Sequence, residues 1–151
     1  MNKNEILIHL SESEMAKIGK EEFAQQSLSQ KVFSAIWELE SEVNNGGFSQ
    51  YFLNGSAESA SFVVQALEKI GASKTANICH RAMVVAFPGG LPETVGAVQS
   101  AAADFSSEIL ENLEPLDQEF FSYPHDLTEL LFAYVNARPE EFGKLPKPND
   151  D

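Results

Sequence analysis

The chain has 151 residues, 43% of them hydrophobic, and a formal net charge of −13 at pH 7. The length suits one domain with a hydrophobic core, and the apolar content excludes a disordered acidic tail. The negative charge disfavours direct binding to nucleic acid or to anionic membranes, because both are bound through Lys and Arg. No apolar stretch reaches the ~20 residues that span a bilayer. The one cysteine, Cys79, cannot form an internal disulfide, so we expect a cytoplasmic protein.

Hydrophobic periodicity predicts helices in the first third of the chain. Residues 1–24 are interpreted as an N-terminal helical segment, whose apolar side chains are Ile6, Leu7, Leu10, Met15 and Ile18. The strongest pattern predicts a helix over residues 28–43. Asn45-Gly46-Gly47 is expected to end this helix, because Asn and Gly accept the left-handed backbone conformation. Residues 48–54 are expected to form a short aromatic helix or a turn.

The rest of the chain is predicted to form further helices separated by Gly, Pro and Ser. They are expected between Ser56 and Gly71, from Ser73 to the loop at residues 88–92, over residues 93–113, from Pro115 to about Ser122, and after Asp126, with a final turn from Pro139. The predicted fold is therefore all-α, a single compact domain of about six to eight helices without a clear strand. Residues 25–142 would form its main body and residues 143–151 a frayed tail.

The charges are distributed unevenly along the chain. No Lys or Arg lies between Arg81 and Arg138, and a second acid-only stretch runs from Lys31 to Lys69. Solvated helices usually mix both signs, because Glu/Lys pairs one turn apart stabilise them slightly. The candidate partner-binding acids form three rows, Glu38 and Glu42, then Asp104, Glu108 and Glu111, then Glu114 and Asp117.

Motifs for catalysis, cofactors or metals are not found. The chain has no phosphate-binding loop, no dinucleotide fingerprint, no His-Glu-x-x-His and no Cys-x-x-Cys. Cys79 and His80 are adjacent, and neighbouring side chains on a helix diverge by ~100°, so the two would not face one ion. We predict no catalytic, cofactor or metal site, and we expect the acids to lie on solvated faces opposite the apolar stripes.

One string, residues 42–52, closely resembles the signature of the DNA-mimic-protein family of small acidic bacterial domains. Its residues are Glu42, Val43, Asn44, Asn45, Gly46, Gly47, Phe48, Ser49, Gln50, Tyr51 and Phe52. The resemblance covers residues 25–142, and it implies an all-helical fold without a cofactor or known catalysis. It further implies that carboxylates stand where a basic DNA-binding protein, such as a transcription factor, expects phosphates. A homodimer is compatible with the family.

Other hypotheses remain open beside DNA mimicry. A related binding function is neutralisation of a basic nuclease by an immunity protein or antitoxin. A different class is an enzyme or small-ligand domain with a pocket in the region Asn44–Tyr51. Turn chemistry alone favours a structural role for this region, with Asn44 and Gln50 bonding exposed backbone ends. A housekeeping domain whose acidity serves only solubility is the third alternative.

Overall fold

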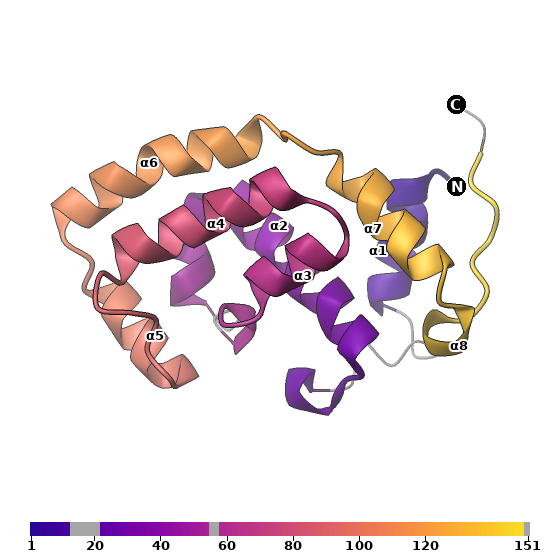
Figure 1. Cartoon of the computed structure of the whole chain (residues 1–151), viewed down its shortest axis with the longest axis horizontal. Helices are drawn as coiled ribbons and strands as arrows, with labels where there is room; N and C mark the ends of the chain where they lie inside the picture. The colour runs from indigo at the N-terminus through magenta and orange to yellow at the C-terminus, as the bar shows by residue number, and fades with distance from the viewer. Residues whose placement is uncertain (13–21, 55–57, 150–151) are drawn as a thin grey trace.

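The computed structural model describes residues 1–12, 22–54 and 58–149, and these residues form helices and no strand (Figure 1). The elements in chain order are α1 (Lys3–Glu12), the 3₁₀ helix η1 (Phe23–Gln25), α2 (Leu28–Leu53), α3 (Val63–Lys69), α4 (Ser73–Ala86), α5 (Val95–Ala103), α6 (Ser107–Phe121), α7 (Leu127–Asn136) and α8 (Pro139–Phe142). The predicted all-α class is confirmed, with eight α-helices in the described ranges. No described helix has the length and apolar character needed to cross a membrane.

Helix α2 is the centre of the fold. Its first turn is closed by a capping box, in which the Ser27 hydroxyl accepts from the Gln30 backbone N–H at 3.3 Å and the Gln30 side chain accepts from the Ser27 N–H at 3.0 Å. The stripe predicted from periodicity is buried, and it includes Val32, Ile36, Leu39 and Val43. Helices α3, α5, α6, α7 and α8 all pack against α2, which lies behind α3 and α4 in Figure 1.

The two glycines at residues 46 and 47 interrupt α2. Gly46 has φ −160° and ψ 19°, and Gly47 has φ 77° and ψ −176°, so both depart from helical geometry. The helix resumes at Phe48 and continues to Leu53. The predicted break is therefore confirmed at Asn45-Gly46-Gly47, and the segment after it is a helical continuation that turns its aromatic side chains inward.

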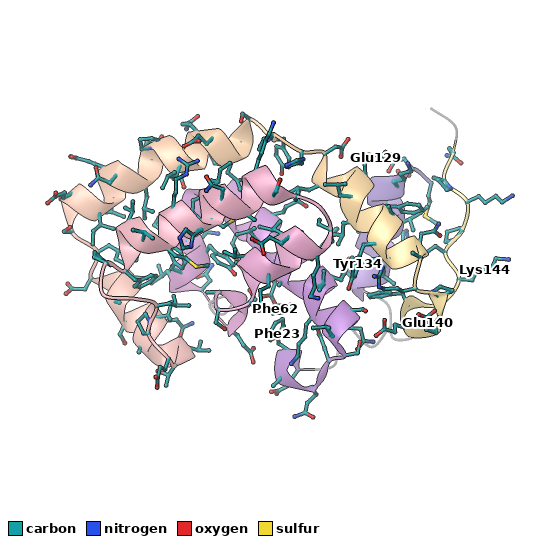
Figure 2. All side chains as sticks on the ribbon, in the orientation of Figure 1. Phe23, Phe62, Glu129, Tyr134, Glu140 and Lys144 are labelled. Atoms are coloured by element: carbon teal, nitrogen blue, oxygen red, sulfur yellow. The ribbon has the colours of Figure 1, made fainter. Side chains whose placement is uncertain are left out.

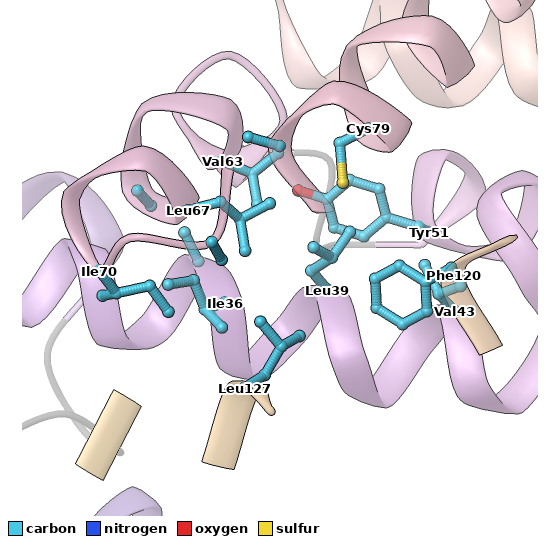
Figure 3. Packing of buried hydrophobic residues seen from close by; sticks show 14 of the residues in the cluster. Ile36, Leu39, Val43, Tyr51, Val63, Leu67, Ile70, Cys79, Phe120 and Leu127 are labelled. Atoms are coloured by element: carbon cyan, nitrogen blue, oxygen red, sulfur yellow. The ribbon is translucent and has the colours of Figure 1, made fainter. Parts of the chain in front are cut away.

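An aromatic cluster joins the second half of α2 to the other helices. Phe52 contacts Phe87 at the end of α4 with ring centroids 5.0 Å apart, and Phe48 contacts Phe120 of α6 at 5.9 Å. Both pairs are edge-to-face, and burial of each ring contributes about 2–3 kcal/mol. Figure 3 shows the aliphatic part of the core beside this cluster, where Leu39 lies close to Tyr51 and Cys79. Nearer the middle of the molecule, Phe23 of η1 meets Phe62 edge-on, with ring centroids 6.2 Å apart (Figure 2).

The predicted helix over residues 93–113 is wrong, because the structure has two helices there. Helix α5 ends at Ala103, and α6 begins at Ser107 after Ser106, whose hydroxyl accepts from the Ile109 N–H at 3.2 Å. Phe105 between them packs on the aromatic cluster, so the apolar spacing persists although the helix does not. A side-chain cap at Ser106 offers the backbone an alternative to a continuous helix.

Pro115 lies inside α6 and does not begin a helix, contrary to the expectation. A proline in a helix leaves the carbonyl four residues earlier without its donor, here that of Glu111. Both residues are exposed, so water can satisfy this carbonyl.

The two ends of the described chain lie together. Helix α1 packs on α7, and its buried Ile6, Leu7 and Leu10 agree with the predicted N-terminal helix. Residues 143–149 follow α8 along the protein, where the Asn149 N–H donates to the Met1 carbonyl at 2.9 Å. The segment expected to be a frayed tail is thus bonded to the N-terminus at residue 149. Met15, Ile18 and Ser56 lie outside the described residues.

Candidate functional site

The interruption of α2 is held by a carboxylate of α6. The Asp117 Oδ1 accepts a hydrogen bond from the Phe48 N–H at 2.9 Å, which satisfies a backbone donor that the kink frees. A Cβ at residue 47 would collide with the Asp117 carboxylate, and the positive φ of Gly47 disfavours any other residue as well. Burial raises the pKa of Asp117 and the Phe48 bond opposes that rise.

Glu42 bridges the two halves of α2 through side-chain amides. Its Oε2 accepts from Gln50 Nε2 at 2.9 Å and from Asn54 Nδ2 at 2.7 Å. Asn44 donates through Nδ2 to the Tyr123 hydroxyl at 2.7 Å. The expectation that Asn44 and Gln50 bond exposed backbone ends is wrong, because both amides reach side chains. The polar residues of the signature string thus fasten the kink.

Glu38 is the most desolvated of the candidate acids that lie on α2. Its Oε2 is buried and has no hydrogen-bond partner among the described residues. Burial raises the pKa of Glu38 to about 7, the hydrogen bond with Ser59 works against this rise, and the charges of Glu58 and Glu42 add to it. Three of the seven candidate acids therefore depart from the expected solvated faces: Asp117 is buried, and Glu38 and Glu42 are half-buried and hydrogen-bonded within the protein.

The remaining four candidates, Asp104, Glu108, Glu111 and Glu114, are exposed. The expected row of Asp104, Glu108 and Glu111 on one helix is wrong, because Asp104 follows α5 as its C-cap. Glu114 instead shares α6 with Glu108 and Glu111, and we call these three residues the α6 ridge. They are spaced by about 4.5 Å along the helix axis. Among the described residues the ion pairs are Lys3–Glu129 and Arg81–Glu119, so no member of the ridge is paired there.

A cleft of about 730 Å³ opens where α1, α2 and the connection from α6 to α7 meet, and Trp37, Glu40, Asn44, Tyr123 and Asp126 contribute to its lining. The Tyr123 hydroxyl, which accepts from Asn44, also bonds the Glu40 carboxylate. Burial raises the pKa of Glu40, with the charge of Asp126 as a smaller cause in the same direction.

Sequence reasoning missed this cleft, although part of its signal was present. Trp37, Glu40, Ser41 and Asn44 are three or four residues apart and share one face of α2. The contributions of Tyr123 and Asp126 come from far along the chain. The alternative of a pocket in the region Asn44–Tyr51 is met only in part, because Asn44 lines the cleft whereas Tyr51 is fully buried.

The surroundings of Cys79 and His125 indicate structural roles for both side chains. Burial raises the pKa of the Cys79 thiol well above its usual range. His125 Nε2 accepts from the Lys74 N–H at 3.1 Å and so caps the start of α4, while Asp126 caps α7 through the Glu129 N–H at 3.1 Å. Within the described ranges, His, Cys, Asp and Glu do not gather in groups of three that could hold a metal ion.

Comparison with known proteins gives one match. The model of the family described as DMP19-like protein matches residues 24–138, which is most of the chain. No curated protein and no solved structure matches. The matched range contains the whole of α2 and the α6 ridge.

Proposed function

This chain belongs to the DMP19-like protein family. We propose that it mimics DNA, as a cytoplasmic, non-catalytic protein that binds a basic DNA-binding protein, such as a transcription factor. Its carboxylates would occupy the places of DNA phosphates on that partner. The observation that carries the proposal is the α6 ridge, whose three carboxylates are exposed and have no cation beside them in the described residues.

The spacing of the ridge supports contact with a row of cations. Three carboxylates about 4.5 Å apart cover about 9 Å of helix axis, a length over which one DNA strand presents about three phosphates. Asp104 precedes the ridge at the end of α5, and Asp126 follows it at the start of α7, and both are exposed. Exposed acids therefore flank α6 in the chain on both sides of the ridge.

The ion pairing of α6 also favours the ridge as the surface that binds the partner. Arg81 of α4 is a cation in contact with α6, and it is engaged by Glu119, with Nη2 and Oε1 2.7 Å apart. Glu119 is therefore paired with a cation, whereas the three ridge carboxylates take part in no ion pair among the described residues. An unneutralised row attracts cationic surfaces over about 10 Å at moderate ionic strength and less at high salt.

A charge-matched comparison tests the proposal. One variant carries Glu108→Gln, Glu111→Gln and Glu114→Gln. The control variant carries Glu12→Gln, Glu68→Gln and Glu140→Gln, which remove the same number of negative charges from exposed positions on α1, α3 and α8. Wild-type protein immobilised at low salt should retain a DNA-binding protein from the native host, and should displace duplex DNA from that protein after its purification.

Loss of this displacement in the ridge variant, with retention in the control, is the expected result. Equal behaviour of the two variants would instead mean that net charge alone acts, as in a merely solubilising surface. A captured nuclease whose activity is blocked would assign the neutralising function of an antitoxin to the same surface. Failure to displace DNA from any captured protein refutes mimicry.

A further inference from the structure

The cleft beside Trp37 has a lining that suits an organic cation. Its volume of about 730 Å³ lies within the range of small-ligand sites, about 300–1,000 Å³. The carboxylates of Glu40 and Asp126 lie in its wall together with the Trp37 indole, and the described lining includes no Lys, Arg or His. A cation that enters would therefore meet negative charge and an aromatic surface at once.

The polar side chains of the cleft are held in place before any ligand binds. Asn44 donates to the Tyr123 hydroxyl at 2.7 Å, and that hydroxyl in turn bonds Glu40. This series of hydrogen bonds fixes the Glu40 carboxylate, whose second oxygen can still accept a hydrogen bond from a ligand. Tyr123 has a φ of 48°, a left-handed conformation that is uncommon outside glycine and costs on the order of 1 kcal/mol. The turn after α6 thus holds the hydroxyl in the cleft at a conformational cost.

Trp37 is itself held in place by a buried neighbour. Its ring stacks on Phe33 with centroids 5.5 Å apart and an angle of 13° between the rings, and Phe33 is fully buried. The protein already places cations over aromatic rings elsewhere, since Arg138 Cζ lies 3.7 Å from the centre of the Tyr134 ring. A fixed indole next to two carboxylates offers the same contact to a cation from outside.

We propose that this cleft receives an arginine side chain of the basic partner, with the guanidinium bonded to Glu40 and Asp126 beside the Trp37 ring. This inference rests on the proposed function and adds a specific anchor to it. Tyr123 comes two residues after the end of α6, so the anchor lies at the C-terminal end of the acidic helix.

Guanidinium fits this lining better than ammonium. It is planar, it presents several N–H donors that can bridge two carboxylates, and it stacks on aromatic rings. It is also less strongly hydrated than the ammonium of lysine, which favours it at a partly desolvated carboxylate such as Glu40.

Trp37 supplies the readout, because it is the only tryptophan of the chain. The full-length protein is titrated with N-acetyl-arginine amide while the tryptophan emission is followed. A saturable change is expected with this probe, whereas the citrulline analogue, of the same shape but uncharged, should give none. Glu40→Gln and Asp126→Asn should each weaken binding about tenfold or more, because each removes a charge-assisted hydrogen bond.

The variants are chosen to keep the fold. Gln at position 40 still accepts from the Tyr123 hydroxyl, and Asn at position 126 still caps α7. Circular dichroism checks their helix content, and Glu68→Gln on the exposed face of α3 is the matched control that should bind the probe like wild type. Equal affinity for N-acetyl-lysine amide, or a linear response identical in all variants, would overturn the guanidinium site.

The partner assay separates this inference from the proposed function. If the captured partner binds Glu40→Gln and Asp126→Asn as tightly as wild type but not the ridge variant, the arginine anchor is wrong and the mimic function stands. If the cleft binds the arginine probe but no partner depends on the ridge, the mimic function fails and a free guanidinium compound replaces the partner as the source. Weakened partner binding in the cleft variants supports the anchor.

Discussion

The Asp117 carboxylate of α6 accepts the Phe48 N–H at 2.9 Å, across 69 positions of sequence, and so locks the kink of α2 to the acidic helix. This one bond explains why an acid in the middle of an acidic helix does not face solvent. It also links the signature string to α6, since any shift of α6 would expose the freed backbone donor.

Gly47→Ala should destabilise the protein strongly. The substitution places a Cβ against Asp117 and forces an L side chain to a φ of 77°. We expect a loss of about 2 kcal/mol or more in the free energy of unfolding, measured by urea denaturation. Gly96→Ala is the control, because Gly96 lies inside α5 with open space around it, and there the change should stabilise by about 0.5–1 kcal/mol. Equal effects of the two substitutions would contradict the assigned role of the kink.

Asp117→Ala should cost about 1–3 kcal/mol, because it leaves the Phe48 N–H buried without an acceptor. Removal of the exposed Glu111 carboxylate by Glu111→Ala should change stability by less than about 0.5 kcal/mol. Thermal unfolding of the two variants measures the difference. Hydrogen exchange at the Phe48 amide should accelerate in the first variant alone, and unchanged exchange there would argue against the bond.

Ser106→Ala should destabilise the protein at the start of α6. The Ser106 hydroxyl caps α6 through the Ile109 N–H at 3.2 Å, and loss of such a cap costs about 1 kcal/mol. Ser107→Ala changes the next residue, which lies in the first turn of α6 and does not cap it, so its effect should be small. Chemical denaturation of both variants measures the free energy of unfolding. A similar stability for the two would show that the Ser106 cap does not stabilise the start of α6.

Glu38 should make stability depend on pH. Its pKa is raised from an ordinary value of 4.5 to about 7 by burial, so the folded protein binds a proton more tightly than the unfolded chain. The stabilisation is fully present below pH 4.5 and is lost as the pH rises through about 7, with a slope of up to about 1.4 kcal/mol per pH unit. Burial raises the pKa of Glu40 and Asp117 as well, which contributes in the same direction.

Glu38→Gln isolates this contribution. Gln stays neutral, so the variant should be more stable than wild type at pH 8 and should show a flatter profile between pH 5 and pH 8. Glu68→Gln on the exposed face of α3 should keep the wild-type profile. Urea unfolding at several pH values measures all three proteins. An unchanged slope in Glu38→Gln would remove Glu38 as the source of the pH dependence.

Much of the fold follows from local patterns in the sequence. The stripe of α2, its break at Gly46 and Gly47, and the cap at Asp126 all depend on neighbours within one or two turns. Such signals are complete in a short window, because backbone bonding and side-chain capping act over three or four residues. The capping residue Ser106, which separates α5 from α6, was also visible locally in the sequence. The regular apolar spacing around Phe105 nevertheless favoured one continuous helix.

The sequence by itself determined the all-helical class, the position of the kink and the acid-only stretches, because these depend on composition and on nearby residues. Only the tertiary structure decided which acids face solvent. Asp117 is buried against the Phe48 N–H, and Glu38 and Glu42 are half-buried and bonded to Ser59 and to two amides, whereas the α6 ridge stays exposed. The cleft at Tyr123 likewise needs α2 and the α6–α7 turn to meet. Burial arises only when helices pack together, and it changes the pKa and the hydrogen-bond partners of a carboxylate.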